Sequence, residues 1–259
     1  MLRRVEATRY VTPLREGGSL PAVVEADDLG TYVLKFRGAG QGRKALIAEI
    51  VAGEIARSLG LLVPEIVLVT LDPELARAEP DPEIQDLIRA SAGLNLALDY
   101  LPGSLGFDPL VEPPRPELAS RIVWFDTLVA NVDRTPRNPN LLTWHGRLWL
   151  IDHGASLYFH HAWSGWEAAS KRLFAAARDH VLLPFAGTIP EADDALAPLL
   201  TNEVLREIVD LVPAEWLGDE RAFAHAAAVR AAYVRFLSSR LEKPREWVGD
   251  LEEACGQAV

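Results

Sequence analysis

The segment from Trp124 to Leu157, WFDTLVANVDRTPRNPNLLTWHGRLWLIDHGASL, is the part of this sequence from which the fold can be argued. Apolar residues recur in it and just before it at the spacing of a helix that buries one face. These residues are Leu118, Ile122, Phe125 and Val129. We expect this helix to end near Asn131, because the prolines that follow cannot continue it. The segment therefore predicts a loop presented by a rigid helix.

A β-hairpin is predicted to follow this loop. Apolar runs flank His145 and Gly146, a pair suited to a tight turn, and residues 147–151 alternate well enough to form the second strand. Asp152 comes directly after that strand and begins an Asp-His-Gly motif. A loop followed by a hairpin brings the chain back on itself, so the sequence predicts that Asp152 lies close to the loop.

Polar side chains stand at the two ends of this otherwise apolar helix and hairpin: Asp133, Arg137, Asn138 and Asp152. Phosphoryl transfer needs a carboxylate near the attacking hydroxyl and oxygen ligands for Mg²⁺. Asp133 suits the first role, Asn138 with Asp152 suits the second, and Arg137 can face phosphate charge. A plainer interpretation stands beside this one. Asp and Asn beside proline are ordinary turn formers, and an Asp after a strand is an ordinary helix cap.

The order of these residues resembles the order of the catalytic motifs in the protein-kinase-like superfamily. Its catalytic loop carries Asp, then Asn five residues later, then a short hairpin and an Asp-x-Gly metal motif. Within that superfamily the loop looks most similar to that of HipA-like kinases, which has the form Asp-x-His-x-Lys-Asn. Here Asp133 and Asn138 match that form, whereas Thr135 replaces the His and Arg137 replaces the Lys.

The resemblance implies an α+β, two-lobed protein-kinase-like fold, with an N-lobe of antiparallel sheet plus one helix and a mostly helical C-lobe. It implies ATP and Mg²⁺ as cofactors, with Asp133 and Arg137 as catalytic residues and Asn138 and Asp152 as metal ligands. It also implies transfer of the ATP γ-phosphate to serine or threonine hydroxyls of proteins. A lipid or small-molecule kinase of the same fold is one alternative, and a non-catalytic nucleotide-binding scaffold is another.

Short apolar runs near the N-terminus are typical of an antiparallel meander. They span residues 9–14, 21–26 and 31–36, and the first turn between them contains Gly17, Gly18 and Ser19. Glycines let the backbone approach a ligand closely, and backbone N–H groups can hold phosphate oxygens. We therefore predict that this turn contacts the nucleotide. The alternative is that the glycines only reverse the chain.

Lys35 and Glu49 are predicted to form an ion pair that faces the nucleotide. Lys35 lies in the third run, in a Val-x-Lys pattern similar to the third strand of kinases. Apolar residues from Ile47 to Leu59 mark one stripe of a helix, and Glu49 lies off that stripe. HipA-like kinases also show a Glu well ahead of a Leu-Gly-Leu-x-Val-Pro ending, as residues 59–64 do here. Taken alone, such a Lys is usually an edge charge and such a Glu is usually solvated.

The composition limits the classes of function. The chain has 259 residues, 49% of them hydrophobic, and a formal net charge of −11. This acidic balance argues against binding along nucleic acid or an anionic membrane, because such proteins cluster Lys and Arg. The one cysteine, Cys255, excludes a disulfide framework. The sequence shows no apolar signal core and no run near the roughly 20 apolar residues that span a bilayer. It therefore predicts a cytoplasmic protein with no membrane span.

We predict two domains. The first is an N-lobe over residues 1–102 that binds the nucleotide, and the second is a C-lobe over residues 103–259 that holds the catalytic loop and a helical bundle. The boundary falls beside a proline-rich stretch. In the C-lobe, apolar spacing predicts helices over residues 166–178, 202–212 and 219–241. The implied partners are a nucleotide and an unidentified protein or small-molecule acceptor.

Overall fold

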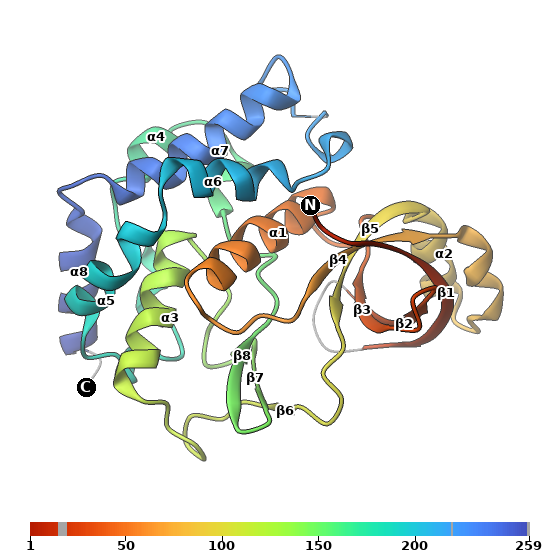
Figure 1. The fold of residues 1–259 in the computed structure, drawn as a ribbon, viewed down its shortest axis with the longest axis horizontal. Coiled ribbons are helices and arrows are strands. Elements are labelled where there is room, and N and C mark those ends of the chain that lie inside the picture. The colour runs from red at the N-terminus through yellow and green to blue at the C-terminus, as the bar shows by residue number, and fades with distance from the viewer. Residues whose placement is uncertain (15–19, 219, 258–259) are drawn as a thin grey trace. The chain divides into compact units, whose positions relative to one another are not determined.

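The computed structural model describes residues 1–14, 20–218 and 220–257. The chain forms two compact units of mixed strand and helix (Figure 1). Unit 1 comprises Met1–Ile47 and Pro64–Gly103, and unit 2 comprises Ala48–Val63 and Ser104–Val259. Helix α1 (Arg43–Ser58) therefore begins in unit 1 and continues into unit 2.

Unit 1 is built on a closed β-barrel with the strand order β1-β2-β3-β5-β4. The strands are β1 (Arg4–Pro13), β2 (Ala22–Ala26), β3 (Thr31–Lys35), β4 (Ile66–Leu71) and β5 (Gly93–Asp99). The predicted antiparallel meander of the first three strands is confirmed. The prediction of a wholly antiparallel sheet is wrong, because the first half of β1 pairs in parallel with β4. This pairing closes the barrel and removes the exposed strand edges of an open sheet.

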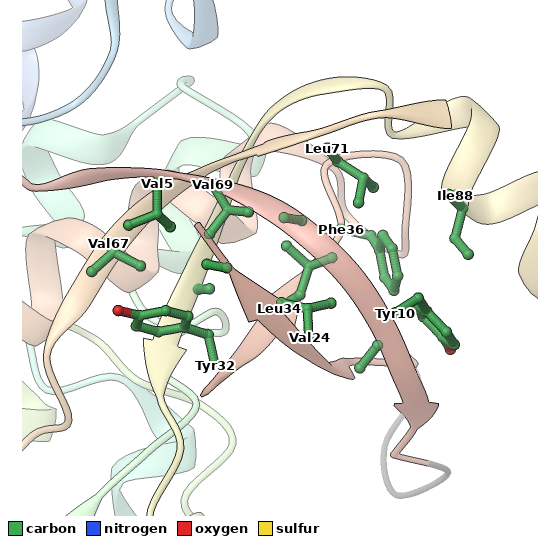
Figure 2. Close-up of a cluster of buried hydrophobic side chains, with 14 of the residues drawn as sticks. Val5, Tyr10, Val24, Tyr32, Leu34, Phe36, Val67, Val69, Leu71 and Ile88 are labelled. Atoms are coloured by element: carbon green, nitrogen blue, oxygen red, sulfur yellow. The ribbon is translucent and has the colours of Figure 1, made fainter. Parts of the chain in front are cut away.

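The barrel interior is the hydrophobic core of unit 1. Side chains from all the barrel strands fill it, among them Val24, Leu34 and Val69, which are fully buried (Figure 2). In β3 the burial alternates, as it must in a strand with one buried face. Tyr32 and Leu34 therefore point into the barrel, and Lys35 lies on the opposite face.

The acidic segment between β4 and β5 forms two short helices. They are the 3-10 helix η1 (Pro73–Ala78) and the α-helix α2 (Pro82–Ala90). Asp81 caps α2 by accepting a hydrogen bond from the Glu83 N–H at 3.0 Å. Ile84 and Ile88 are buried in the barrel core, and Figure 2 shows Ile88 at the end of the barrel where Phe36 also lies. Helix α2 therefore packs on the barrel in addition to the one helix predicted beside the sheet.

Unit 2 contains a three-stranded sheet with the order β6-β7-β8. Its strands are β6 (Leu105–Gly106), β7 (Leu141–Trp144) and β8 (Arg147–Leu150). The predicted hairpin is confirmed, since His145 and Gly146 join β7 to β8. Their φ angles are 50° and 67°, and a type I′ turn needs positive values at both positions. The Leu150 N–H donates to the carbonyl of Leu62 at 2.8 Å, which fastens the hairpin to the chain that follows α1.

The rest of unit 2 is mainly helical. Its α-helices are α3 (Pro116–Leu128), α4 (Trp166–Ala169), α5 (Ile189–Leu196), α6 (Asn202–Asp210), α7 (Ala226–Leu241) and α8 (Glu246–Gln257). Between them lie the 3-10 helices η2 (Tyr158–His161), η3 (Ala175–Asp179), η4 (Leu183–Phe185), η5 (Ala197–Leu199) and η6 (Ala214–Trp216). Helices α3, α5 and α8 meet at Trp124, whose indole N–H donates to Asp193 at 2.9 Å and whose ring centroid lies 5.8 Å from that of Trp247. Helices α6 and α7 lie side by side (Figure 1).

Several helix predictions need correction. The helix predicted over residues 202–212 is present as α6, whereas that predicted over 219–241 starts at Ala226, and Asp219 lies outside the described residues. The prediction of one continuous helix over residues 166–178 is wrong. The carbonyls of Ser170 and Arg172 accept hydrogen bonds from the Arg240 guanidinium, and a continuous helix would use them internally. Within the described ranges, none of the helices has both the length and the apolar character needed to cross a bilayer.

We expect Leu34→Ala to lower the free energy of unfolding by about 2–5 kcal/mol, because it removes buried methyl groups and leaves a cavity in the barrel. Leu29→Ala is the matched control. Leu29 is 96% exposed in the turn before β3, so its truncation should change the free energy by no more than about 0.5 kcal/mol. Denaturant unfolding followed by circular dichroism measures both variants. Equal losses would contradict the assignment of Leu34 to the barrel core.

Candidate active site

The candidate site is built at the C-terminal end of α3, where Asp126 is buried. The Asp126 carboxylate accepts hydrogen bonds from Asn131 Nδ2 at 2.8 Å, Arg134 Nε at 2.6 Å and His180 Nε2 at 3.0 Å. The Leu182 N–H donates to His180 Nδ1 at 3.0 Å, so we assign the imidazole proton to Nε2. Donors from the loop and from the distant residue 180 therefore hold one buried carboxylate in place.

Asp126 and Arg134 form an ion pair whose side chains are 1% and 0% exposed. Burial works to raise the pKa of Asp126. The Arg134 charge and the hydrogen bond from His180 outweigh burial and hold that pKa well below its ordinary value. The carboxyl group is therefore ionised at neutral pH, and the pair ties α3 to the loop that follows it.

Arg134 also joins the two chain segments that carry the predicted site residues. Its guanidinium donates to the backbone carbonyl of Asn140, at the end of the loop, and to that of Ile151 at 3.3 Å. The Ile151 N–H donates to the same Asn140 carbonyl at 3.1 Å. Ile151 immediately precedes Asp152, so one buried guanidinium fixes both the end of the loop and the start of the Asp-His-Gly motif.

The loop brings Asp133 and Asn138 together. Nδ2 of Asn138 donates to the Asp133 carboxylate at 2.8 Å, which turns the amide oxygen of Asn138 away from Asp133. Thr135 and Asn138 exchange two backbone hydrogen bonds, each 3.1 Å long, and so close a tight turn between them. Arg137 lies in this turn and is exposed.

Asp152 lies close enough to Asp133 for its charge to act there. Burial raises the pKa of Asp133, the hydrogen bond from Asn138 opposes that rise, and the negative charge of Asp152 adds to it. Asp152 has a φ of 53° and Asn140 a φ of 50°, a left-handed conformation that costs a non-glycine residue on the order of 1 kcal/mol or more. Such conformations persist where surrounding contacts hold them. Arg134 supplies such contacts, because it binds the carbonyl of Asn140 and that of Ile151, the residue before Asp152.

The residues at this site fit a hard divalent cation. Asn138 and Asp152 offer an amide oxygen and a carboxylate, the ligand types that Mg²⁺ prefers. The Asp152 charge raises the pKa of Asp133, and a bound cation would relieve that repulsion. Among the described residues, no group of three or more His, Cys, Asp or Glu side chains is arranged to hold a metal. Mg²⁺ held by one or two carboxylates and by substrate phosphates needs no such group.

Glu49, on α1, is fully buried, and so it differs from the solvated glutamate of the plainer interpretation. Its Oε1 lies 3.4 Å from Nδ1 of His153. Its predicted partner, Lys35, belongs to unit 1. The turn residues predicted to contact the nucleotide lie outside the described part of the chain: Gly17, Gly18 and Ser19. The nucleotide contacts proposed for all these residues therefore stay predictions.

Sequence reasoning missed the residues that hold the site together, namely Asp126, Arg134, His153 and His180. Asp126 carried a usable signal, because it is a charged residue within an otherwise apolar stretch of helix, and a buried charge needs a partner. Arg134 stands next to Asp133 and was the nearest candidate for that partner. His180 carried no signal, because it lies 54 residues from Asp126 and no spacing rule connects them.

Comparison with solved structures shows a kinase-like fold. CtkA, a proinflammatory kinase from Helicobacter pylori, is similar with a TM-score of 0.57 at 14% identity, and 99% of each chain is covered. The Golgi casein kinase with Mn/ADP bound is similar with a TM-score of 0.50 at 13% identity, over 96% of this chain and 74% of that chain. Another structure of the Golgi casein kinase gives a TM-score of 0.50 at 11% identity, over 99% of this chain and 73% of that chain.

The sequence profile of the HipA-like kinase family matches residues 8–249. The chain therefore belongs to the HipA-like kinase family, and the resemblance seen in the loop motif is confirmed. No curated protein sequence matches the chain significantly. Family and fold together make the protein a protein-kinase-like phosphotransferase.

We expect Arg134→Ala to lower the free energy of unfolding by about 3–5 kcal/mol, because it leaves the Asp126 carboxylate buried without its charged partner. Arg137→Ala is the matched control in the same loop. Arg137 is exposed, so its removal should change the free energy by no more than about 0.5 kcal/mol. Denaturant unfolding measures both, and an Arg134→Ala variant as stable as Arg137→Ala would refute the buried network.

The same network should make the free energy of unfolding depend on pH. The folded-state pKa of Asp126 lies below the usual value of 3.8, so the unfolded chain takes up this proton first as the pH falls. The stabilisation by Asp126 is therefore complete above about pH 5 and is lost progressively below about pH 4. We expect the unfolding free energy of the wild type to fall more steeply over this range than that of Asp126→Asn, which cannot titrate there. Denaturant unfolding at several pH values gives both slopes, and parallel slopes would contradict the assignment.

Proposed function

We propose that this protein is an ATP- and Mg²⁺-dependent kinase that transfers the γ-phosphate of ATP to a hydroxyl group. The observation that supports this most is the convergence of Asp133, Asn138 and Asp152 in a member of the HipA-like kinase family. Phosphoryl transfer asks a protein for positioning and charge compensation more than for covalent chemistry. A carboxylate beside two oxygen ligands for a metal meets that demand.

In this proposal Asp133 receives the acceptor hydroxyl and orients it or takes its proton. Burial and the nearby Asp152 charge raise the pKa of Asp133, which makes its carboxylate a stronger base than an exposed aspartate. Asn138 and Asp152 would hold Mg²⁺, which supplies charge compensation to the nucleotide phosphates. Arg137, exposed in the turn between Asp133 and Asn138, would face phosphate charge.

We also propose the two-lobed organisation of kinases for this chain, with residues 1–102 as the nucleotide-binding N-lobe and residues 103–259 as the C-lobe. The Golgi casein kinase structure with Mn/ADP bound supports a nucleotide and a divalent metal as ligands. The candidates for phosphate contacts are Lys35 and the turn residues Gly17, Gly18 and Ser19, with Glu49 as the partner of Lys35. These assignments rest on the sequence pattern.

The acceptor that we propose is a serine or threonine side chain of a protein. Membership of the HipA-like family supports this choice, and so does a casein kinase among the structural neighbours. A screen with labelled ATP tests it directly, with protein, lipid-vesicle and small-metabolite mixtures offered in parallel. Labelling confined to lipid or metabolites would replace the protein acceptor. ATP binding without transfer to any acceptor, water included, would favour the non-catalytic scaffold.

The roles of the central residues can be separated by comparing binding with turnover. Asp152→Ala should abolish the part of ATP affinity that depends on Mg²⁺, because the phosphates lose charge compensation. Asn138→Ala should reduce it less, because a neutral ligand contributes less charge. Asp133→Asn leaves the metal ligands in place, so Mg²⁺-ATP should still bind while phosphate transfer falls by about 10² to 10⁴, the usual effect of losing a positioned acid–base group.

The measurements are ATP affinity with and without Mg²⁺ and single-turnover transfer of the γ-phosphate, with folding checked by circular dichroism. Arg137→Ala, in the same loop, tests whether exposed charge contributes to nucleotide affinity. Full transfer activity in Asp133→Asn would rule out the role given to Asp133. Unchanged Mg²⁺ dependence in Asp152→Ala would rule out the metal site.

A further inference from the structure

We propose that His153 is a positioning residue, which couples the Glu49 carboxylate on α1 to the turn that carries Asp152. The proposal rests on the proposed kinase function, because it takes Asp152 as a metal ligand. His153 is the middle residue of the Asp-His-Gly motif, and its side chain is fully buried. The sequence analysis gave this position no chemical role.

His153 contacts two helices of unit 2 and also closes its own turn. Its Nδ1 lies 3.4 Å from Oε1 of Glu49, and both side chains are 0% exposed. Its ring meets the ring of Phe125 on α3 edge-on, with the two centroids 5.9 Å apart. Its backbone carbonyl accepts a hydrogen bond from the Ser156 N–H at 2.9 Å, which closes the turn after Asp152. The imidazole therefore reaches α1 and α3 from the turn that follows Asp152.

The hydrogen-bonding surroundings assign the imidazole proton. Among the described residues, Nε2 of His153 is buried and has no hydrogen-bond partner. A proton on Nε2 alone would bury an N–H without an acceptor and would set the lone pair of Nδ1 against the oxygen of Glu49. A proton on Nδ1 donates to that oxygen instead. The proton therefore belongs on Nδ1, and His153 is a hydrogen-bond donor to Glu49.

This contact links the position of α1 to the position of the metal ligand. A buried carboxylate is costly unless donors compensate it, and the His153 donor is one of the contacts that restrain Glu49. His153 follows Asp152 directly, and the φ of 53° at Asp152 lies in a narrow allowed region that permits little adjustment. A displacement of Glu49 is therefore passed to Asp152 through one side chain. Phenylalanine at this position would keep the contact with Phe125 but would supply no donor.

The test compares two substitutions in the full-length protein. His153→Phe keeps a ring of similar size and removes the donor, whereas His153→Asn places an amide N–H near the position of Nδ1. We expect His153→Phe to raise the Mg²⁺ concentration for half-maximal binding of a non-hydrolysable ATP analogue by about tenfold or more, the usual effect of losing a hydrogen bond behind a metal ligand. His153→Asn should recover most of this affinity. Turnover of ATP should follow the same order.

A metal-free double-mutant cycle provides the second measurement. If the two side chains are coupled, His153→Phe should change the unfolding equilibrium constant severalfold less in a Glu49→Gln background than in the wild type. Equal effects in both backgrounds would overturn the coupling. A His153→Phe variant with unchanged Mg²⁺ dependence, or a His153→Asn variant as impaired as His153→Phe, would overturn the positioning role while the proposed function stands. A wild type that binds no nucleotide with Mg²⁺ would overturn the proposed function instead, and with it the link to the metal.

Discussion

The buried ion pair between Asp126 and Arg134 is the constraint on which the candidate site depends. Taking two charges out of water costs on the order of several kcal/mol per ion, so the pair is not by itself a source of stability. Further hydrogen bonds offset that cost, from Asn131 and His180 to the carboxylate and from the guanidinium to backbone carbonyls. An apolar pair of the same volume could not select particular carbonyl groups, because apolar contacts have no preferred direction. The planar fork of the guanidinium determines which carbonyls meet, and so it sets the path of the loop.

Contacts within the chain restrict the conformation of the loop. Pro136 and Pro139 restrict the unfolded loop, so less conformational entropy is lost when it folds. Asn140 and Asp152 adopt left-handed conformations that a mobile loop would not keep. Arg134 fixes the carbonyl of Asn140 and that of the residue before Asp152, which are the points where the strain has to be supported. A site whose loop is already ordered loses little conformational entropy when a ligand binds, and a mechanism based on positioning requires this.

Local contacts made part of the site predictable from the sequence. Asp133 and Asn138 stand five residues apart in one turn, and the hairpin at His145 and Gly146 leads the chain back, so spacing was enough to bring Asp152 near them. The support behind these residues was not predictable in the same way. His180 reaches Asp126 across 54 residues, and no periodicity marks such a pairing. The spacing that put Glu49 off the apolar stripe of its helix could not predict its burial or its contact with His153, 104 residues away.

The fold shows the same division between local and distant contacts. Strands β2 and β3 were evident because each is a short apolar run between turn residues. Closure of the barrel was not evident, because it needs Arg4 to pair with Leu68. The first half of β1 buries only Val5 and Ala7, which are flanked and separated by polar residues, so it lacks the apolar run of a recognisable strand. Its place is decided by the partner strand and not by its own composition.

Arg240 shows that the C-terminal helices also support the site. It is buried on α7, and its guanidinium donates to the carbonyls of Thr127 at 2.9 Å, Ser170 at 3.1 Å and Arg172 at 3.0 Å. Thr127 lies in the last turn of α3, where the helix dipole favours a cation, and the ring of Trp247 on α8 lies 4.9 Å from the guanidinium carbon. Thr127 is the neighbour of Asp126 in the chain. Helices α7 and α8 carry none of the candidate site residues, yet they fix the end of α3 from which the Asp126 carboxylate reaches Arg134 and so orders the loop.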